Sequence, residues 1–157
     1  MVELISMYQQ QLQILGNVAL AMLLGAVLGF EREFAHKPAG LRTHMMVAGA
    51  AALLVALSDI IVRHFNVKMG QSVVQSDPLR VIEAVITGVS FLGAGTIIRR
   101  GSVAAIEGLT TAATLLFVAG VGITVALSQW VLATGVVVLA LATLRVLHVF
   151  SRWSGLH

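Results

Sequence analysis

Residues 24–44, LGAVLGFEREFAHKPAGLRTH, superpose without a gap on residues 92–112, LGAGTIIRRGSVAAIEGLTTA. Both stretches begin with Leu-Gly-Ala, carry an arginine at the same position (Arg32 and Arg100) and contain Gly-Leu-x-Thr near the end. Each runs from the end of one apolar segment through a polar loop into the next apolar segment. Because two apolar segments separate equivalent points, the two hairpins have the same orientation, as in parallel repeats related by an axis along the membrane normal. The match predicts a repeated helix hairpin, with chance similarity between Gly- and Leu-rich segments as the alternative.

The sequence around this repeat has the composition of a membrane protein. The 157 residues are 58% hydrophobic and 11% charged, and the mean hydropathy is +0.95, whereas a soluble domain carries about 25% charged residues. This composition excludes a soluble globular enzyme. We expect an all-α, polytopic membrane protein with one membrane domain over residues 1–157. Its five transmembrane helices would form two parallel hairpins plus a fifth helix, and they are expected at about residues 12–30, 45–62, 81–98, 109–127 and 130–150.

Small residues recur at every fourth position of the first two apolar runs. In lipid, this spacing lets helix backbones approach closely enough for dispersion to hold them together. We expect the two stripes to serve packing inside the protein, with a seam between two copies as the alternative; they consist of Ala21, Gly25, Gly29, Ala48, Ala52 and Ala56.

The distribution of Lys and Arg predicts the orientation in the membrane. The segments on the side of the N-terminus carry Arg63, Lys68 and Arg80. The segments on the other side carry more, namely Arg32, Lys37, Arg42, Arg99, Arg100, Arg145 and Arg152. Since cytoplasmic loops hold the excess of positive charge, we expect the N-terminus outside and the C-terminus in the cytoplasm. No Lys or Arg precedes the first apolar run, so we expect a retained membrane helix rather than a signal peptide.

The two repeated loops are candidate binding sites on the cytoplasmic face. Their arginines lie beside helix N-termini, which carry partial positive charge and unpaired N–H groups, so the loops suit carboxylates, phosphates or lipid headgroups. The threonine hydroxyls could cap those helices. The alternative is local pairing of the arginines with Glu31, Glu33 and Glu107. The candidate residues are Glu31, Arg32, Arg42, Thr43, His44, Arg99, Arg100, Thr110 and Thr111.

Two carboxylates fall inside the predicted spans. Asp59 and Glu83 are candidates for a cation path because a charged group inside a membrane is costly. Thr87 and Ser90 continue a polar stripe from Glu83 along the same helix face. The alternative is pairing with neighbouring arginines, Arg63 at i+4 of Asp59 and Arg80 at i−3 of Glu83. Two arginine-paired acids are poor ligands for magnesium.

The sequence contains no motif for catalysis, metal binding, cofactor binding or nucleic-acid binding. The chain has no cysteine, and its five histidines show no ligand spacing. We find no nucleophile triad, no phosphate-binding loop and no basic patch interleaved with aromatic residues. We therefore expect no enzyme, no cofactor, no metal site and no nucleic-acid partner.

Four motifs, in order, resemble the MgtC/SapB family of bacterial membrane proteins. They are GFERE (29–33), AGLRTH (39–44), FLGAG (91–95) and GLTTAATL (108–115), and the resemblance covers roughly residues 16–127. It implies a bacterial inner-membrane protein that acts under magnesium limitation or in virulence by binding and restraining other membrane proteins, including the proton-translocating ATP synthase. Longer members carry a soluble C-terminal domain, so we expect a short form here. The resemblance transfers to Glu31, Arg32, Gly40, Leu41, Arg42, Thr43, His44, Gly93, Gly95, Gly108, Thr110 and Thr111.

The functional expectation is a regulatory stress-response protein that contacts another inner-membrane protein and membrane lipids. We also expect a homo-oligomer, with a dimer as the simplest form. The alternative is a magnesium-linked ion transporter or channel that uses Asp59 and Glu83. A third hypothesis is a lipid-dependent scaffold that binds anionic lipid through the inward arginines.

Overall fold

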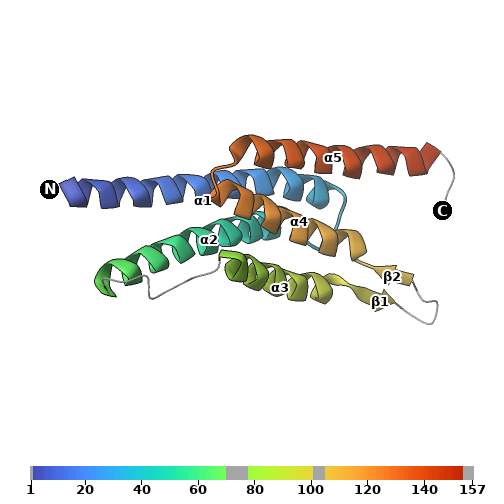
Figure 1. Ribbon diagram of the computed structural model, residues 1–157. Coiled ribbons are helices and arrows are strands. Elements are labelled where there is room, and N and C mark those ends of the chain that lie inside the picture. Colours follow the sequence, from blue (N-terminus) through green and yellow to red (C-terminus); the bar gives the residue numbers. More distant parts are fainter. Residues whose placement is uncertain (1, 70–77, 101–104, 154–157) are drawn as a thin grey trace.

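The computed structural model describes the backbone of residues 2–69, 78–100 and 105–153, and the side chains of residues 5–63, 79–97 and 107–145. The described chain consists mainly of helices, with one short β-hairpin before the fourth helix (Figure 1). The elements in chain order are α1 (Val2–Phe34), α2 (Leu41–Met69), α3 (Pro78–Thr96), β1 (Ile98–Arg100), β2 (Ala105–Glu107), α4 (Leu109–Ala126) and α5 (Trp130–Trp153).

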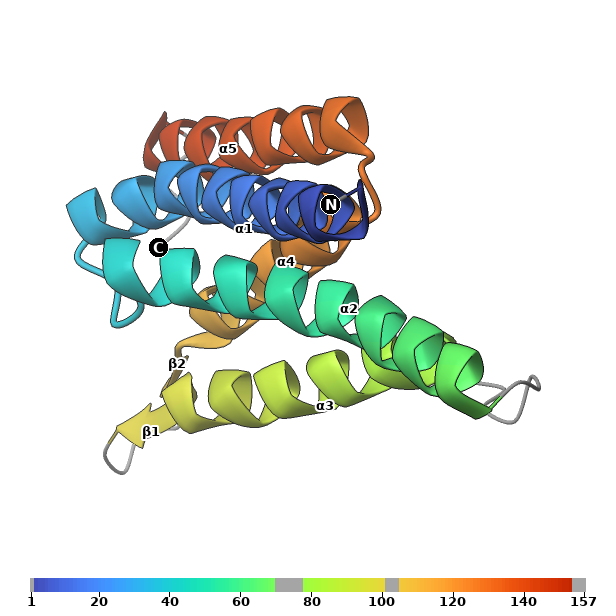
Figure 2. The ribbon, with the colours of Figure 1, turned by 90° about the vertical axis from the view of Figure 1, so that its left-hand side faces the viewer.

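Helix α4 is the centre of the bundle. It contacts each of the other four helices, and in Figure 1 and Figure 2 it crosses between α5 and α1 on one side and α2 and α3 on the other. Its sequence contains no charged residue, so it can be enclosed on several sides without burying an unpaired charge. The core is therefore built around α4, and its fully buried members include Leu28, Leu115, Val118, Val121 and Val125.

Helices α1 and α2 form the tightest hairpin. A Cβ atom added at Gly25 would lie 2.6 Å from the carbonyl oxygen of His44, and one added at Gly29 would lie 2.8 Å from the Cα of Leu41. The two backbones therefore touch where the sequence places small residues. Ala21 and Ala48 are fully buried beside them. This part of the small-residue pattern serves packing within one chain, as expected.

The second hairpin repeats a contact of the first. A Cβ atom added at Gly93 would lie 3.3 Å from the Cβ of Ala112. Gly93 and Ala112 are the residues that superpose on Gly25 and His44, which also face each other. In both hairpins the second helix begins directly after the repeated glycine, at Leu41 and Leu109. The structure thus confirms the two parallel hairpins and the fifth helix.

The loops of the two hairpins differ. Two residues after the end of α1, His36 adopts the left-handed conformation (φ 53°), and the N–H groups of His36 and Lys37 donate to the carbonyls of Glu33 and Arg32, both at 3.0 Å. In the second hairpin, β1 pairs antiparallel with β2 instead, with Arg99 opposite Ile106. These strands were not expected from the sequence. Helix α3 ends at Thr96, two residues before the expected end of the third span, where three β-branched residues follow one another.

The connection from α4 to α5 is tight, in keeping with the two residues left between the expected spans at 109–127 and 130–150. Ser128 adopts the left-handed conformation (φ 59°). Its N–H donates to the carbonyl of Val125 at 2.9 Å, and the N–H of Gln129 donates to that of Thr124 at 3.1 Å. These two bonds satisfy carbonyls at the end of α4 and reverse the chain within a few residues.

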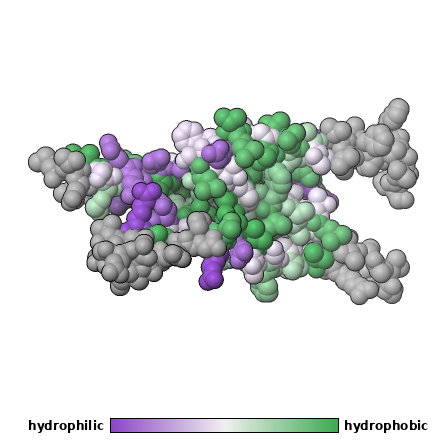
Figure 3. Space-filling model, viewed as in Figure 1, coloured by the Kyte–Doolittle hydropathy of each residue, from purple (hydrophilic) through white to green (hydrophobic). Residues whose placement is uncertain are grey.

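Helices α1 to α4 are long and apolar enough to cross a membrane, and the described apolar part of α5, Trp130–Arg145, is shorter. Many large apolar side chains point outward, among them Leu23, Phe91 and Val131. Figure 3 shows hydrophobic residues over the middle of the molecule and hydrophilic ones toward the N-terminal end of α1. An apolar exterior of this extent suits lipid as the surrounding solvent, so the five-helix membrane fold is confirmed.

Candidate functional site

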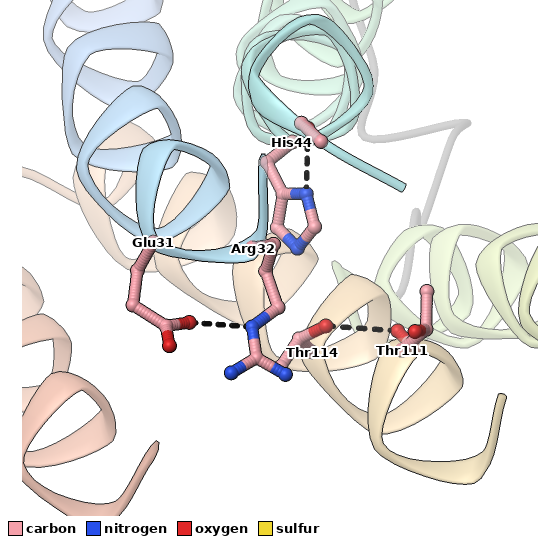
Figure 4. A network of polar contacts seen from close by, with 6 residues as sticks. Glu31, Arg32, His44, Thr111 and Thr114 are labelled. Carbon is pink, nitrogen blue, oxygen red and sulfur yellow. Dashed lines mark hydrogen bonds and ion pairs between the residues drawn. The ribbon is translucent and has the colours of Figure 1, made fainter. Parts of the chain in front are cut away.

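Five buried polar side chains meet where the end of α1 faces the starts of α2 and α4. We call this group the buried polar cluster; it comprises Glu31, Arg32, His44, Thr111 and Thr114, each at most 8% exposed (Figure 4). All but Thr114 were predicted as loop binding residues from the sequence. The structure brings them together from three helices, because the glycine contacts at Gly25 and Gly29 draw α1 and α2 close.

Arg32 and Glu31 form a buried ion pair. The Nε atom of Arg32 donates to Oε2 of Glu31, and the two side chains are 5% and 10% exposed. A buried charge needs a partner because it loses the solvation of water. Of the two possibilities left open by the sequence, the structure thus shows for Arg32 the local pairing with Glu31, inside the cluster and not on an open basic surface.

His44 is fully buried, and one of its ring nitrogens has no partner in the described part of the chain. Its Nδ1 lies 2.9 Å from the carbonyl oxygen of Gly40, so that nitrogen carries the proton and donates. Nε2 is the one completely buried side-chain nitrogen or oxygen without a hydrogen-bond partner among the described residues. In Figure 4 it faces the side chain of Arg32. The cluster thus contains an ion pair and an unsatisfied nitrogen within one small volume.

The helix starts are capped differently from the prediction. Glu33 extends from the end of α1, and its Oε2 accepts a hydrogen bond from the N–H of Leu41 at 2.8 Å, so Glu33 caps α2. Helix α4 begins after Gly108 (φ 95°), which makes no side-chain cap bond. Thr111 is buried in the first turn of α4, where its carbonyl accepts from the hydroxyl of Thr114 at 2.9 Å. The predicted threonine cap of α4 is therefore wrong.

The remaining predicted loop residues divide into surface residues and residues outside the described side chains. Arg42 and Thr43 are exposed on the first turn of α2 and line a surface hollow of about 290 Å³ with Glu33, Gly40 and Leu41. Thr110 is exposed on α4. Arg99 and Arg100 belong to β1, but their side chains lie outside the described part.

The intramembrane carboxylates lie in separate surroundings. Asp59 pairs with Arg63 at 2.9 Å, as the spacing suggested. Glu83 and Ser90 are exposed on α3, where the hydroxyl of Thr87 donates to the backbone carbonyl of Glu83 at 2.8 Å. Among the described side chains, Glu83 does not form the ion pair with Arg80 that was the alternative to a cation path, and no group of three or more His, Asp or Glu residues could hold a metal ion.

The chain was compared with known proteins. The model of the MgtC family matches residues 18–153. An uncharacterized protein of Haemophilus influenzae is 35% identical over 140 residues, which cover 89% of this chain and 58% of that protein. The protein named MgtC of Brucella abortus is 42% identical over 103 residues, which cover 66% of this chain and 38% of the relative. The protein named MgtC of Salmonella typhimurium is 38% identical over 114 residues, which cover 73% and 43%.

The chain thus spans between 38% and 58% of the length of these curated relatives. No solved structure matches it. The family match extends over nearly all of the fold described above, from the first half of α1 to the end of α5, and includes the whole buried polar cluster. The chain belongs to the MgtC family.

Proposed function

We propose that this protein is a regulatory protein of the bacterial inner membrane that acts by binding other membrane proteins, the ATP synthase among them. The proposal includes a role under magnesium limitation or in virulence, a homo-oligomeric and most simply dimeric state, and an N-terminus on the outer side. The structural support is the first turn of α2, where Arg42 and Thr43 are exposed beside a surface hollow. No covalent chemistry is required for such a role.

Contacts made by the end of α1 explain how this turn can be presented in a fixed geometry. The cap from Glu33 holds the start of α2. The residues of the buried ion pair, Glu31 and Arg32, directly precede Glu33 on α1. The exposed side chain of Arg42 thus extends from a helix start that is held in place, which lowers the conformational entropy lost on binding. Arginine suits such a contact because its planar fork can bind a carboxylate through two hydrogen bonds.

Capture from native membranes tests the contact. We expect the Arg42→Ala variant to recover its membrane partners at about a tenth of the wild-type level or less, since a charge-assisted bond typically contributes about 1.5–3 kcal/mol. Partners are quantified by mass spectrometry after mild solubilisation. The matched control is Arg145→Ala, which removes an exposed arginine from α5. Equal recovery by Arg42→Ala and wild type would show that this turn is not the contact.

Ion transport is the second candidate function, and the exposed carboxylate of Glu83 on a span-length helix is the observation that favours it. The separate placement of Asp59 and Glu83 argues against a shared path. We therefore expect magnesium flux into sealed proteoliposomes to equal that of empty vesicles. Flux that is present in wild type and lost in Glu83→Gln, with both proteins shown to be folded, would instead establish the transporter.

A further inference from the structure

A second polar site lies at the opposite end of the bundle from the buried polar cluster. A cavity of about 600 Å³ opens between α1, α2 and the turn that joins α4 to α5. Figure 3 shows a hydrophilic patch toward this end of the molecule. The polar residues of the lining are Gln10, Gln13, Asn17, Ser58, Asp59, Arg63 and Ser128.

Three amide side chains line the α1 wall of this cavity. Gln10, Gln13 and Asn17 follow the spacing i, i+3 and i+7, which places them on one helix face. They lie in a helix that is otherwise apolar enough to cross a membrane. Within the described side chains, none of the three amides makes a hydrogen bond. Gln10 and Gln13 are exposed and Asn17 is half-buried, so the amide donors and acceptors of this wall are open to a polar occupant of the cavity.

The facing wall, on α2, carries charges of both signs. Asp59 and Arg63 bond to each other at 2.9 Å, yet their side chains are 57% and 71% exposed. An ion pair this exposed contributes little and can be exchanged for contacts with an incoming molecule. The residues Ala126 and Leu127 at the end of α4 also line the cavity. The C-terminal end of a helix carries partial negative charge, which adds attraction for a cation there.

The size and lining of the cavity define the chemistry of its occupant. The volume is far larger than the roughly 30 Å³ of one water molecule and falls in the range of small-molecule sites. The charged groups of the lining sum to zero, so a molecule with one positive and one negative group matches them better than a simple ion. Apolar residues, including Ile14, Val55 and Val62, line the remainder and suit the aliphatic part of an amphiphile.

We propose that this cavity binds a phosphoethanolamine-type zwitterion. The ammonium group lies toward Asp59 and the end of α4, the phosphate lies toward Arg63, and the amides of Gln13 and Asn17 bond the phosphate and glycerol oxygens. Phosphatidylethanolamine headgroups and free glycerophosphoethanolamine share this chemistry. The cavity lies on the second half of α2 and Arg42 on its first turn, so this proposal does not rest on the partner contact proposed above.

The test measures binding to the full chain purified in detergent. Native mass spectrometry and thermal unfolding are recorded with phosphatidylethanolamine, with anionic phosphatidylglycerol and with soluble glycerophosphoethanolamine. We expect wild type to retain phosphatidylethanolamine in preference to phosphatidylglycerol. The double variant Asp59→Asn/Arg63→Gln should bind phosphatidylethanolamine about tenfold more weakly or worse, because it loses both charge-assisted contacts. A shift by glycerophosphoethanolamine alone identifies a free zwitterion as sufficient, whereas a response to the lipid alone identifies the bilayer as the source.

Two further variants keep the test decisive. Asn17→Leu removes an amide without changing charge and should weaken phosphatidylethanolamine binding while the helix content is retained. Arg145→Gln removes an exposed charge outside the cavity and should bind as wild type does. The proposal is overturned by equal retention of both lipids in wild type, by a preference for phosphatidylglycerol, or by wild-type binding in folded Asn17→Leu and Asp59→Asn/Arg63→Gln.

Discussion

Replacement of Gly122 by alanine will destabilise the fold by about 3 kcal/mol, the upper end of the range for overpacked cores. The added Cβ atom would lie 2.2 Å from the carbonyl oxygen of Ala48 and 3.0 Å from the Cβ of Ala51. A backbone carbonyl in a helix cannot rotate away, so α2 and α4 must move apart. Because α4 contacts every other helix, the separation should loosen the whole bundle. Thermal unfolding in detergent, followed by circular dichroism and gel filtration, measures the loss.

The control lies two residues away on the same helix. Gly120 is exposed, and a Cβ atom added there meets nothing within 4 Å. Alanine is a better helix former than glycine by about 1 kcal/mol, so Gly120→Ala should match or exceed wild-type stability. If Gly122→Ala unfolds at the same temperature as Gly120→Ala, the close crossing of α2 and α4 is wrong.

The contrast between these two glycines shows what the sequence could predict about packing. The four-residue spacing of Gly25 and Gly29 predicted a close helix contact. In the structure, Gly25 lies against the backbone of His44 and Gly29 against that of Leu41. Gly120 and Gly122 belong to one short motif in an apolar helix, and no periodic pattern tells which of them faces another backbone. That choice depends on the rotation of α4 about its axis. Helix rotation is set by packing with several neighbours, which a single sequence does not encode locally.

The candidate site was predictable in its residues but not in their exposure. The repeated loops pointed to Glu31, Arg32 and His44, and the structure places these in one cluster. Arg32 and Arg42 are equivalent in the sequence, since both are arginines next to a helix end, yet Arg32 is buried and Arg42 is exposed. The distinction depends on which helix face points into the bundle once α1, α2 and α4 are packed. The cap by Glu33 was missed for a related reason, since Glu33 lies eight residues before the N–H that it binds.

The amides of the second cavity illustrate the same limit. Gln10, Gln13 and Asn17 lie on one helix face, and this spacing is visible in the sequence. Their relation to Asp59 and Arg63 is not visible, because it depends on the antiparallel register of α1 and α2. The glycine contacts set that register near the other end of the hairpin. The small-residue stripe fixes how α1 and α2 align, and this alignment places the amides of α1 opposite Asp59. The site therefore exists only in the folded structure.

Replacement of Arg32 by alanine should have the largest effect of any change in the buried polar cluster. The variant leaves the carboxylate of Glu31 buried without its partner, and breaking a buried ion pair in this way costs about 3–5 kcal/mol. It also removes the side chain that faces the unpaired Nε2 of His44. We expect Arg32→Ala to lose most of its folded fraction in detergent, measured by thermal unfolding and by the monodisperse peak in gel filtration.

A set of related variants separates charge, geometry and packing at this position. Arg32→Lys keeps the charge but loses the planar fork, so it should fall between wild type and Arg32→Ala. The double variant Glu31→Gln/Arg32→Met removes both charges at similar volume and should recover much of the stability, because the cost in Arg32→Ala comes mainly from the unpaired carboxylate. Arg145→Ala, an exposed arginine without a described ion pair, should change stability by less than about 0.5 kcal/mol. If Arg32→Ala were as stable as Arg145→Ala, the side chain of Arg32 would lie in solvent, and the basic surface expected from the sequence would replace the buried polar cluster.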